Sequence, residues 1–182
     1  MENNPPIRIG LDLDGVLVDK PPLIPKRLLE WFFRGGTADS LNCRFPCSKF
    51  NQKIRKLSHF YLLRPPIRKN ILFMERVVQD NRFEIYLISA RYSFLTKETE
   101  TWLKKRKIKR LFKKIYLNLD DEQPHLFKLK VLQGLKPKIY VDDDKIILEF
   151  LKKQLPEINF VSFPGVDLPG LINKLWVQKR LQ

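Results

Sequence analysis

Short apolar runs alternate with amphipathic stretches along most of the chain. Five runs rich in β-branched and aromatic residues are typical of buried strands, namely Ile7–Leu13, Phe83–Ser89, Lys114–Leu119, Lys138–Asp142 and Ile158–Phe163. Between them, apolar residues recur three and four positions apart, which predicts helices at Ile67–Gln79, Ser93–Lys107, Leu126–Leu135, Ile146–Gln154 and Leu168–Trp176. This alternation calls for right-handed crossovers. The sequence therefore predicts an α/β fold with a doubly wound, mainly parallel five-stranded sheet and helices on both faces.

One long interval interrupts the alternation. Residues 20–66 separate the first strand from the helix that leads to the second, and the interval begins with Pro21–Pro22 and ends with Pro65–Pro66. A connection between a strand and a helix usually has only a few residues, so we interpret the interval as an inserted helical cap. Its expected helices are Leu28–Phe33 and Phe50–Leu63. The predicted organisation is a catalytic core formed by residues 1–19 and 67–182, with a cap at residues 20–66.

Acidic residues end two of the predicted strands. The first strand ends in Asp12-Leu13-Asp14, and the fourth ends in Asp142-Asp143-Asp144. Ligands of open α/β sheets gather at the carboxyl ends of the strands. A single acidic pair is more often a helix cap or a turn, but carboxylates from two strand ends would repel one another in a shared cleft unless a hard cation lay between them. The pattern therefore favours a Mg²⁺ site.

The order of these segments resembles the haloacid dehalogenase (HAD) superfamily of phosphatases. Its first motif, an apolar strand followed by Asp-x-Asp-Gly-(Thr/Val), matches Ile9–Asp19. Its second motif, a strand that ends in Ser or Thr, matches YLISAR at Ser89, and its fourth motif, a strand that ends in paired acids, matches IYVDDD. The third motif is a lysine on the helix before that strand, for which Lys128 is the candidate and Lys130 the fallback.

The resemblance implies a phosphomonoester hydrolase that forms an aspartyl-phosphate intermediate. Asp12 would be the nucleophile, and Asp14 would protonate the leaving alcohol and then deprotonate the hydrolytic water. Ser89 and Lys128 would bind the phosphoryl group and offset its developing charge. These four residues are the expected catalytic residues.

The resemblance also implies Mg²⁺ as the cofactor. Its expected ligands are Asp12, the backbone carbonyl of Asp14, and the pair Asp142 and Asp143. The sequence leaves open which member of that pair binds the metal directly, and we expect Asp144 to be a loop or capping residue.

Arg91 and the two histidines are weaker candidates. Arg91 lies just beyond Ser89 and is a candidate for a bidentate contact with the substrate phosphate, although an exposed salt bridge fits its position equally well. His59 and His125 have no partners at the spacing of a metal site or a catalytic triad, so we expect neither to act in catalysis.

The chain is strongly basic, with a formal net charge of +15 over 182 residues. Residues 20–69 contain twelve Lys and Arg residues against two acids, and a field of this sign attracts phosphorylated partners. The aromatic residues of this segment could stack on a nucleobase or form the core of the cap. Motif order is similar both to deoxyribonucleotide 5′-nucleotidases and to the phosphatase domain of polynucleotide kinase-phosphatases.

These observations predict hydrolysis of a nucleotide or another small phosphorylated metabolite. The alternatives are a phosphatase that acts on polynucleotide ends, and a basic nucleic-acid-binding protein with a silent HAD site. The sequence does not identify the individual substrate within these classes, and it leaves the oligomeric state open.

The sequence has no sign of a membrane protein. Its apolar runs are far shorter than the roughly 20 residues of a membrane-spanning helix, and the first residues lack the order of a signal peptide. We therefore expect a cytoplasmic protein without membrane partners, whose cysteines, Cys43 and Cys47, are ordinary reduced thiols.

Overall fold

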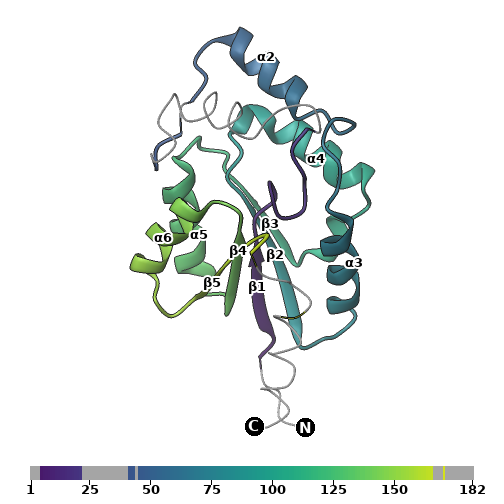
Figure 1. Cartoon of the computed structure of the whole chain (residues 1–182), viewed down its shortest axis with the longest axis vertical. Coiled ribbons are helices and arrows are strands. Elements are labelled where there is room, and N and C mark those ends of the chain that lie inside the picture. The colour runs from purple at the N-terminus through teal and green to yellow at the C-terminus, as the bar shows by residue number, and fades with distance from the viewer. Residues whose placement is uncertain (1–4, 22–40, 44, 166–169, 171–182) are drawn as a thin grey trace.

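The computed structural model describes residues 5–21, 41–43, 45–165 and 170. Its five strands are β1 (Ile7–Leu11), β2 (Phe83–Ser89), β3 (Lys114–Leu117), β4 (Ile139–Asp142) and β5 (Asn159–Ser162). They form one sheet in the order β3-β2-β1-β4-β5, in which every neighbouring pair is parallel (Figure 1). The predicted five-stranded sheet is therefore confirmed, and strand pairing in the described part of the chain is wholly parallel. Every predicted strand except β2 was one or two residues too long, and the chain turns soon after β1 and after β3.

Helices cover both faces of the sheet, as the sequence predicted. One face carries α3 (Arg68–Val77) and α4 (Thr96–Lys105), and the other carries α5 (Pro124–Leu135) and α6 (Lys145–Gln154) (Figure 1). Successive side chains of a strand point to opposite faces. Accordingly, Ile85 and Leu87 of β2 lie in the core beneath α3 and α4, whereas Tyr86 and Ile88 lie in the core beneath α5 and α6.

The single helix predicted at Ser93–Lys107 consists of a 3₁₀ turn followed by an α-helix. A 3₁₀ turn, η1 (Ser93–Leu95), leads into α4, and a second 3₁₀ turn, η2 (Lys109–Leu111), follows α4 before β3 begins. The helix expected at residues 168–176 falls almost entirely outside the described residues.

The second half of the long insertion contains one described helix, α2 (Lys49–Ser58). Ser48 caps its start by accepting a hydrogen bond from the N–H of Phe50. The helix ends five residues earlier than predicted, at Ser58, and residues 61–63 form a turn instead. The helix expected at residues 28–33 lies outside the described residues, so the cap as a separate unit stays a prediction.

The insertion returns to the sheet beside the loop that follows β1. The N–H of Asp19 donates to the carbonyl of Pro65 at 2.8 Å, and the N–H of Ile67 donates to the carbonyl of Leu17 at 2.8 Å. Val18 and Pro66 form an antiparallel bridge between these two bonds. This pairing fixes the residue before Pro65 next to the first acidic motif. In the described part of the chain, no helix combines the length and apolar character needed to cross a membrane.

Candidate active site

Two of the acidic residues lie on adjacent strand ends in the middle of the sheet. Asp12 follows β1, and its N–H donates to the carbonyl of Val141 on β4 at 2.9 Å, which extends the pairing of the two strands. Asp142 is the last residue of β4, and both side chains are buried. One carboxylate oxygen from each of Asp12, Asp142 and Asp143 lies within 4.8 Å of the others. Three buried or half-buried carboxylates at this spacing fit a hard divalent cation such as Mg²⁺.

Gly15 leaves the space that Asp143 occupies. Its φ of +73° is a left-handed conformation that glycine adopts without strain. A Cβ atom built on Gly15 would lie 2.1 Å from Cγ of Asp143, so any other residue there would displace that carboxylate. Glycine at this position thus allows the loop after β1 to pack against the end of β4.

Lys128 of α5 lies between the nucleophile candidate and β4. Its Nζ is 2.6 Å from Oδ2 of Asp142 and 3.1 Å from Oδ1 of Asp12, and its side chain is buried. Burial alone would lower the pKa of Lys128, but Asp12 and Asp142 outweigh it and raise that pKa. The fallback candidate, Lys130, instead pairs with Glu122 on the surface. Lys128 is therefore the lysine that the fold brings to the acidic cluster.

The pKa of Asp12 is raised well above its ordinary value. Burial is the main cause, Lys128 opposes it, and the carboxylates of Asp142 and Asp14 add to it. Such a crowded anionic group is stabilised in its ionised form by any cation that binds among the three carboxylates.

Asp142 and Asp144 are held by protein donors. Oδ2 of Asp142 accepts hydrogen bonds from Lys128 and from the hydroxyl of Tyr140, and its Oδ1 accepts from the N–H of Asp144. The side chain of Asp144 accepts from two N–H groups in the first turn of α6, which confirms the expectation that it is a capping residue.

Ser89 ends β2 at the same edge of the sheet. Its side chain is 1% exposed, and among the described residues its Oγ has no hydrogen-bond partner. A buried hydroxyl without a partner costs free energy, and such exceptions need an explanation. A phosphoryl oxygen bound at this edge would satisfy it.

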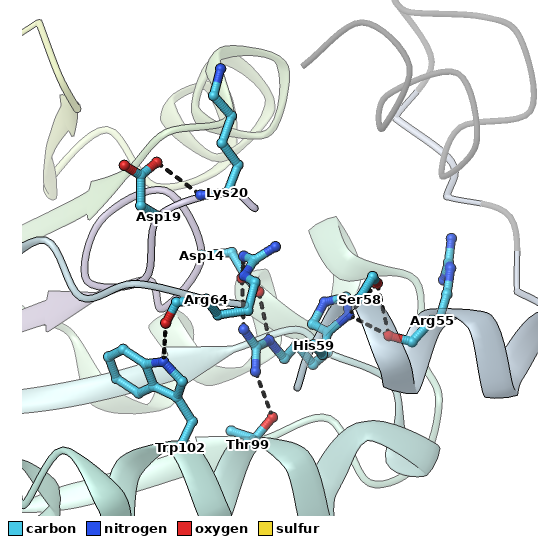
Figure 2. Close-up of polar contacts among 10 residues, drawn as sticks. Asp14, Asp19, Lys20, Arg55, Ser58, His59, Arg64, Thr99 and Trp102 are labelled. Carbon is cyan, nitrogen blue, oxygen red and sulfur yellow. Dashed lines mark hydrogen bonds and ion pairs between the residues drawn. The ribbon is translucent and has the colours of Figure 1, made fainter. Parts of the chain in front are cut away.

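Asp14 forms a separate charged group with two arginines (Figure 2). Nε of Arg91 is 2.7 Å from Oδ2 of Asp14, and Nη2 of Arg91 is 2.7 Å from Oδ1. A guanidinium nitrogen of Arg64 also pairs with Oδ1 of Asp14. Burial would raise the pKa of Asp14, but the charges of Arg91 and Arg64 outweigh it and lower that pKa strongly. Asp14 is thus ionised in this arrangement, and the side chain of Arg91 is buried, whereas that of Asp14 is 34% exposed.

Helix α4 supports both arginines. The hydroxyl of Thr99 accepts from Nη1 of Arg91 at 3.1 Å, and Nε1 of Trp102 donates to the carbonyl of Arg64 at 2.7 Å (Figure 2). Sequence reasoning did not identify Arg64. Its place directly before Pro65–Pro66 is visible in the sequence, but its contact with Asp14 depends on the tertiary pairing of residues 65–67 with residues 17–19.

The two histidines were expected to have no catalytic role, and each lies in a local structural setting. His59 is buried next to the Asp14 group, where desolvation and the charge of Arg91 lower its pKa to about 3. It is therefore neutral near pH 7. His125 lies in the first turn of α5 and packs edge-on against Phe150, with ring centroids 5.0 Å apart.

Comparisons with known proteins point to one fold family. No family profile matches the sequence. A curated protein of Oceanobacillus iheyensis, named "Putative nucleotidase OB0422", is 28% identical over 97 residues, which is 53% of this chain and 50% of that protein. The chain thus aligns with about half the length of this curated relative.

Solved structures resemble almost the whole chain. A HAD family enzyme of Bacteroides thetaiotaomicron, solved as an aspartate-to-alanine mutant with magnesium and inorganic phosphate, has a TM-score of 0.56 at 13% identity, over 92% of this chain and 99% of that one. The HAD domain of the effector Lem4 from Legionella pneumophila gives 0.52 at 13% identity, over 98% and 100%. A chain of the Pnkp1/Rnl/Hen1 RNA repair complex gives 0.54 at 14% identity, over 86% of this chain and 42% of that one. The protein therefore has the HAD fold.

Proposed function

We propose that this protein is a Mg²⁺-dependent phosphomonoester hydrolase with Asp12 as its nucleophile. The observation that carries the proposal is the cluster of Asp12, Asp142 and Asp143 around a single point at the carboxyl edge of a HAD-type sheet, with Lys128 buried against it. A carboxylate can attack phosphorus only when cations neutralise the oxygens that would otherwise repel it.

The metal would be held by Asp12, the backbone carbonyl of Asp14 and one of the two acids after β4. Bound there, Mg²⁺ would offset the negative charge of the phosphoryl oxygens and of the nucleophile. Both Asp142 and Asp143 are candidates for the direct ligand, because an oxygen of each lies in the cluster with Asp12.

The chain's own residues supply the nucleophile and the group that would transfer protons in the two halves of the reaction. In the first half, an oxygen of Asp12 bonds to phosphorus while the bond from phosphorus to the leaving oxygen breaks, and a proton passes to that oxygen from Asp14. In the second half, Asp14 takes a proton from water as the water oxygen bonds to phosphorus, and the bond from phosphorus to Asp12 breaks, which releases phosphate and restores the Asp12 carboxylate. Asp14 is ionised in this structure, which is the form required for the second half, whereas the first half requires that Asp14 take up a proton against the charges of Arg91 and Arg64. Ser89 and Lys128 would contact the phosphoryl oxygens throughout.

The proposed substrate is a nucleotide or another small phosphorylated metabolite. The likeness to a protein named as a nucleotidase supports this choice. The net charge of +15 and the likeness to a chain of an RNA repair complex support the alternative, a phosphatase for polynucleotide ends. A silent site is the weaker alternative, because every acid of the expected pattern is present at the sheet edge.

A phosphatase screen tests the proposed function. We expect the protein to release phosphate from nucleoside monophosphates, sugar phosphates or phosphorylated oligonucleotides with Mg²⁺, and to lose this activity with EDTA. Asp12→Asn should abolish turnover without loss of the fold, because the amide keeps the shape but not the charge of the nucleophile. Activity that survives complete chelation, or that persists in the pure variant, would contradict the proposal.

A further inference from the structure

The cations of the site form two groups, one around Asp12 and one around Asp14. Lys128 contacts Asp12 and Asp142, on the side of the nucleophile. Arg64 and Arg91 contact Asp14, whose proposed partner is the leaving oxygen. The second group therefore lies beside the part of the substrate that departs.

This second group carries more positive than negative charge. Two guanidinium groups surround one carboxylate, and His59 beside them is neutral near pH 7. The charges of Asp19 and Asp143 also act on Arg64. Asp19 is exposed, so solvent screens its charge, and Asp143 belongs to the proposed metal cluster, where the cation would offset its charge. Two arginines whose side chains are 5% and 6% exposed would be costly to bury around a single anion unless a further anion joined them.

Arg64 also retains an unused donor. Its Nε is buried and has no hydrogen-bond partner among the described residues, although the side chain is 6% exposed. The group opens toward solvent through Asp14, whose side chain is 34% exposed compared with 7% for Asp12. An anion attached to the leaving group could therefore reach the arginines, because it need not enter the buried metal cluster.

We infer that Arg64 and Arg91 bind a second phosphate group on the leaving side of the substrate, so that the preferred substrates carry a phosphate next to the ester that is cleaved. The inference rests on the proposed function and narrows its substrate class. A planar guanidinium suits this role, because its donors contact two oxygens of one phosphate at once. The second phosphate has two sources, a terminal phosphate of a small bisphosphate or the phosphodiester next to a polynucleotide end.

Matched substrates test the inference. We expect kcat/KM to be about 10-fold to 100-fold higher for a nucleoside 3′,5′-bisphosphate, or for a 3′-phosphorylated dinucleotide, than for the nucleoside 3′-monophosphate. Preference for the dinucleotide would identify a polynucleotide end, and preference for the bisphosphate would identify a small metabolite. A hexose bisphosphate compared with its monophosphate removes the base from the comparison.

Variants of Arg64 connect the preference to this site. In Arg64→Gln the ratio between bisphosphate and monophosphate should fall toward one, and both substrates depend on Asp14 equally, so the ratio isolates the second phosphate. Arg64→Lys keeps the positive charge but loses the planar guanidinium, so it should also reduce the ratio. This variant replaces Arg64→Gln in the test if the glutamine variant fails to fold. Arg110→Gln, the same change at an exposed site on η2, is the control and should leave the ratio unchanged.

Binding to the Asp12→Asn protein separates this inference from the proposed function. Calorimetry should give tighter binding of the bisphosphate than of the monophosphate, with the difference lost in the double variant that also carries Arg64→Gln. If the bisphosphate binds in this way but the native chain hydrolyses no phosphomonoester, the proposed function is wrong and the anion site remains. Turnover with equal kcat/KM for both substrates, or a ratio that Arg64→Gln does not alter, would overturn the inference.

Discussion

The buried hydroxyl of Ser89 is the residue whose role can be isolated most cleanly. Because no described residue accepts or donates a hydrogen bond to its Oγ, Ser89→Ala should leave the free energy of unfolding unchanged or slightly raised. Removal of a donor to the reacting phosphoryl group should lower kcat by about 10²-fold to 10³-fold. Thermal unfolding and steady-state kinetics measure the two effects separately.

Ser93→Ala is the matched control for Ser89. The hydroxyl of Ser93 donates to Asp121 at 2.9 Å, so its loss should cost about 1 kcal/mol of stability. Its effect on kcat should be much smaller than that of Ser89→Ala. A destabilised Ser89→Ala protein with unchanged kcat would show that Ser89 has only a structural role.

At the level of single residues, the sequence predicted the acidic motifs better than their partners. Asp12, Ser89 and Asp142 were found because each directly follows or ends an apolar strand, and parallel strands bring their carboxyl ends to one edge. Arg64 could not be found in this way. It reaches Asp14 only through the tertiary pairing of residues 65–67 with residues 17–19, which no local pattern encodes.

At the level of elements, one of the three consecutive acids has a structural role, because Asp144 caps the start of α6 while Asp142 and Asp143 lie in the acidic cluster. Asp144 accepts hydrogen bonds from the N–H groups of Ile146 and Ile147, at 3.1 and 3.2 Å. Asp144→Ala should therefore cost about 1 kcal/mol of stability through the lost helix cap. Metal affinity should change much less than in Asp143→Ala, which removes a proposed ligand.

Thermal unfolding with and without Mg²⁺ measures both effects. The shift in unfolding temperature caused by Mg²⁺ should persist in Asp144→Ala and shrink in Asp143→Ala. A shift that disappears in Asp144→Ala and persists in Asp143→Ala would reverse the proposed roles of the two residues.

Element boundaries were predicted less well than element types. The helix at Phe50–Leu63 was predicted from its apolar period, but α2 ends at Ser58 and residues 61–63 form a turn. The apolar residues of that turn continue the period without continuing the helix, so the period does not mark where the helix ends. The strands, by contrast, were each located to within a few residues, because a run buried on both faces has a strong apolar signal.

At the level of the whole molecule, the charge of +15 gives a test that separates the two substrate classes. A polynucleotide contacts many cations, and for single strands log affinity should fall with log salt by about 0.7 per neutralised phosphate. Charge reversal at the exposed residues Lys53 and Lys56 of α2 should make this slope shallower. A small phosphorylated metabolite should give a shallow slope that the charge reversal does not alter.

The central claim, an aspartyl-phosphate at Asp12, is tested most directly by trapping the intermediate. Acid quenching during turnover, followed by borohydride reduction and peptide mass spectrometry, should locate the modification at Asp12. The signal should require Mg²⁺ and be absent from Asp12→Asn. A protein that turns over substrate under these conditions, yet carries the phosphoryl group on another residue or on none, would contradict the account.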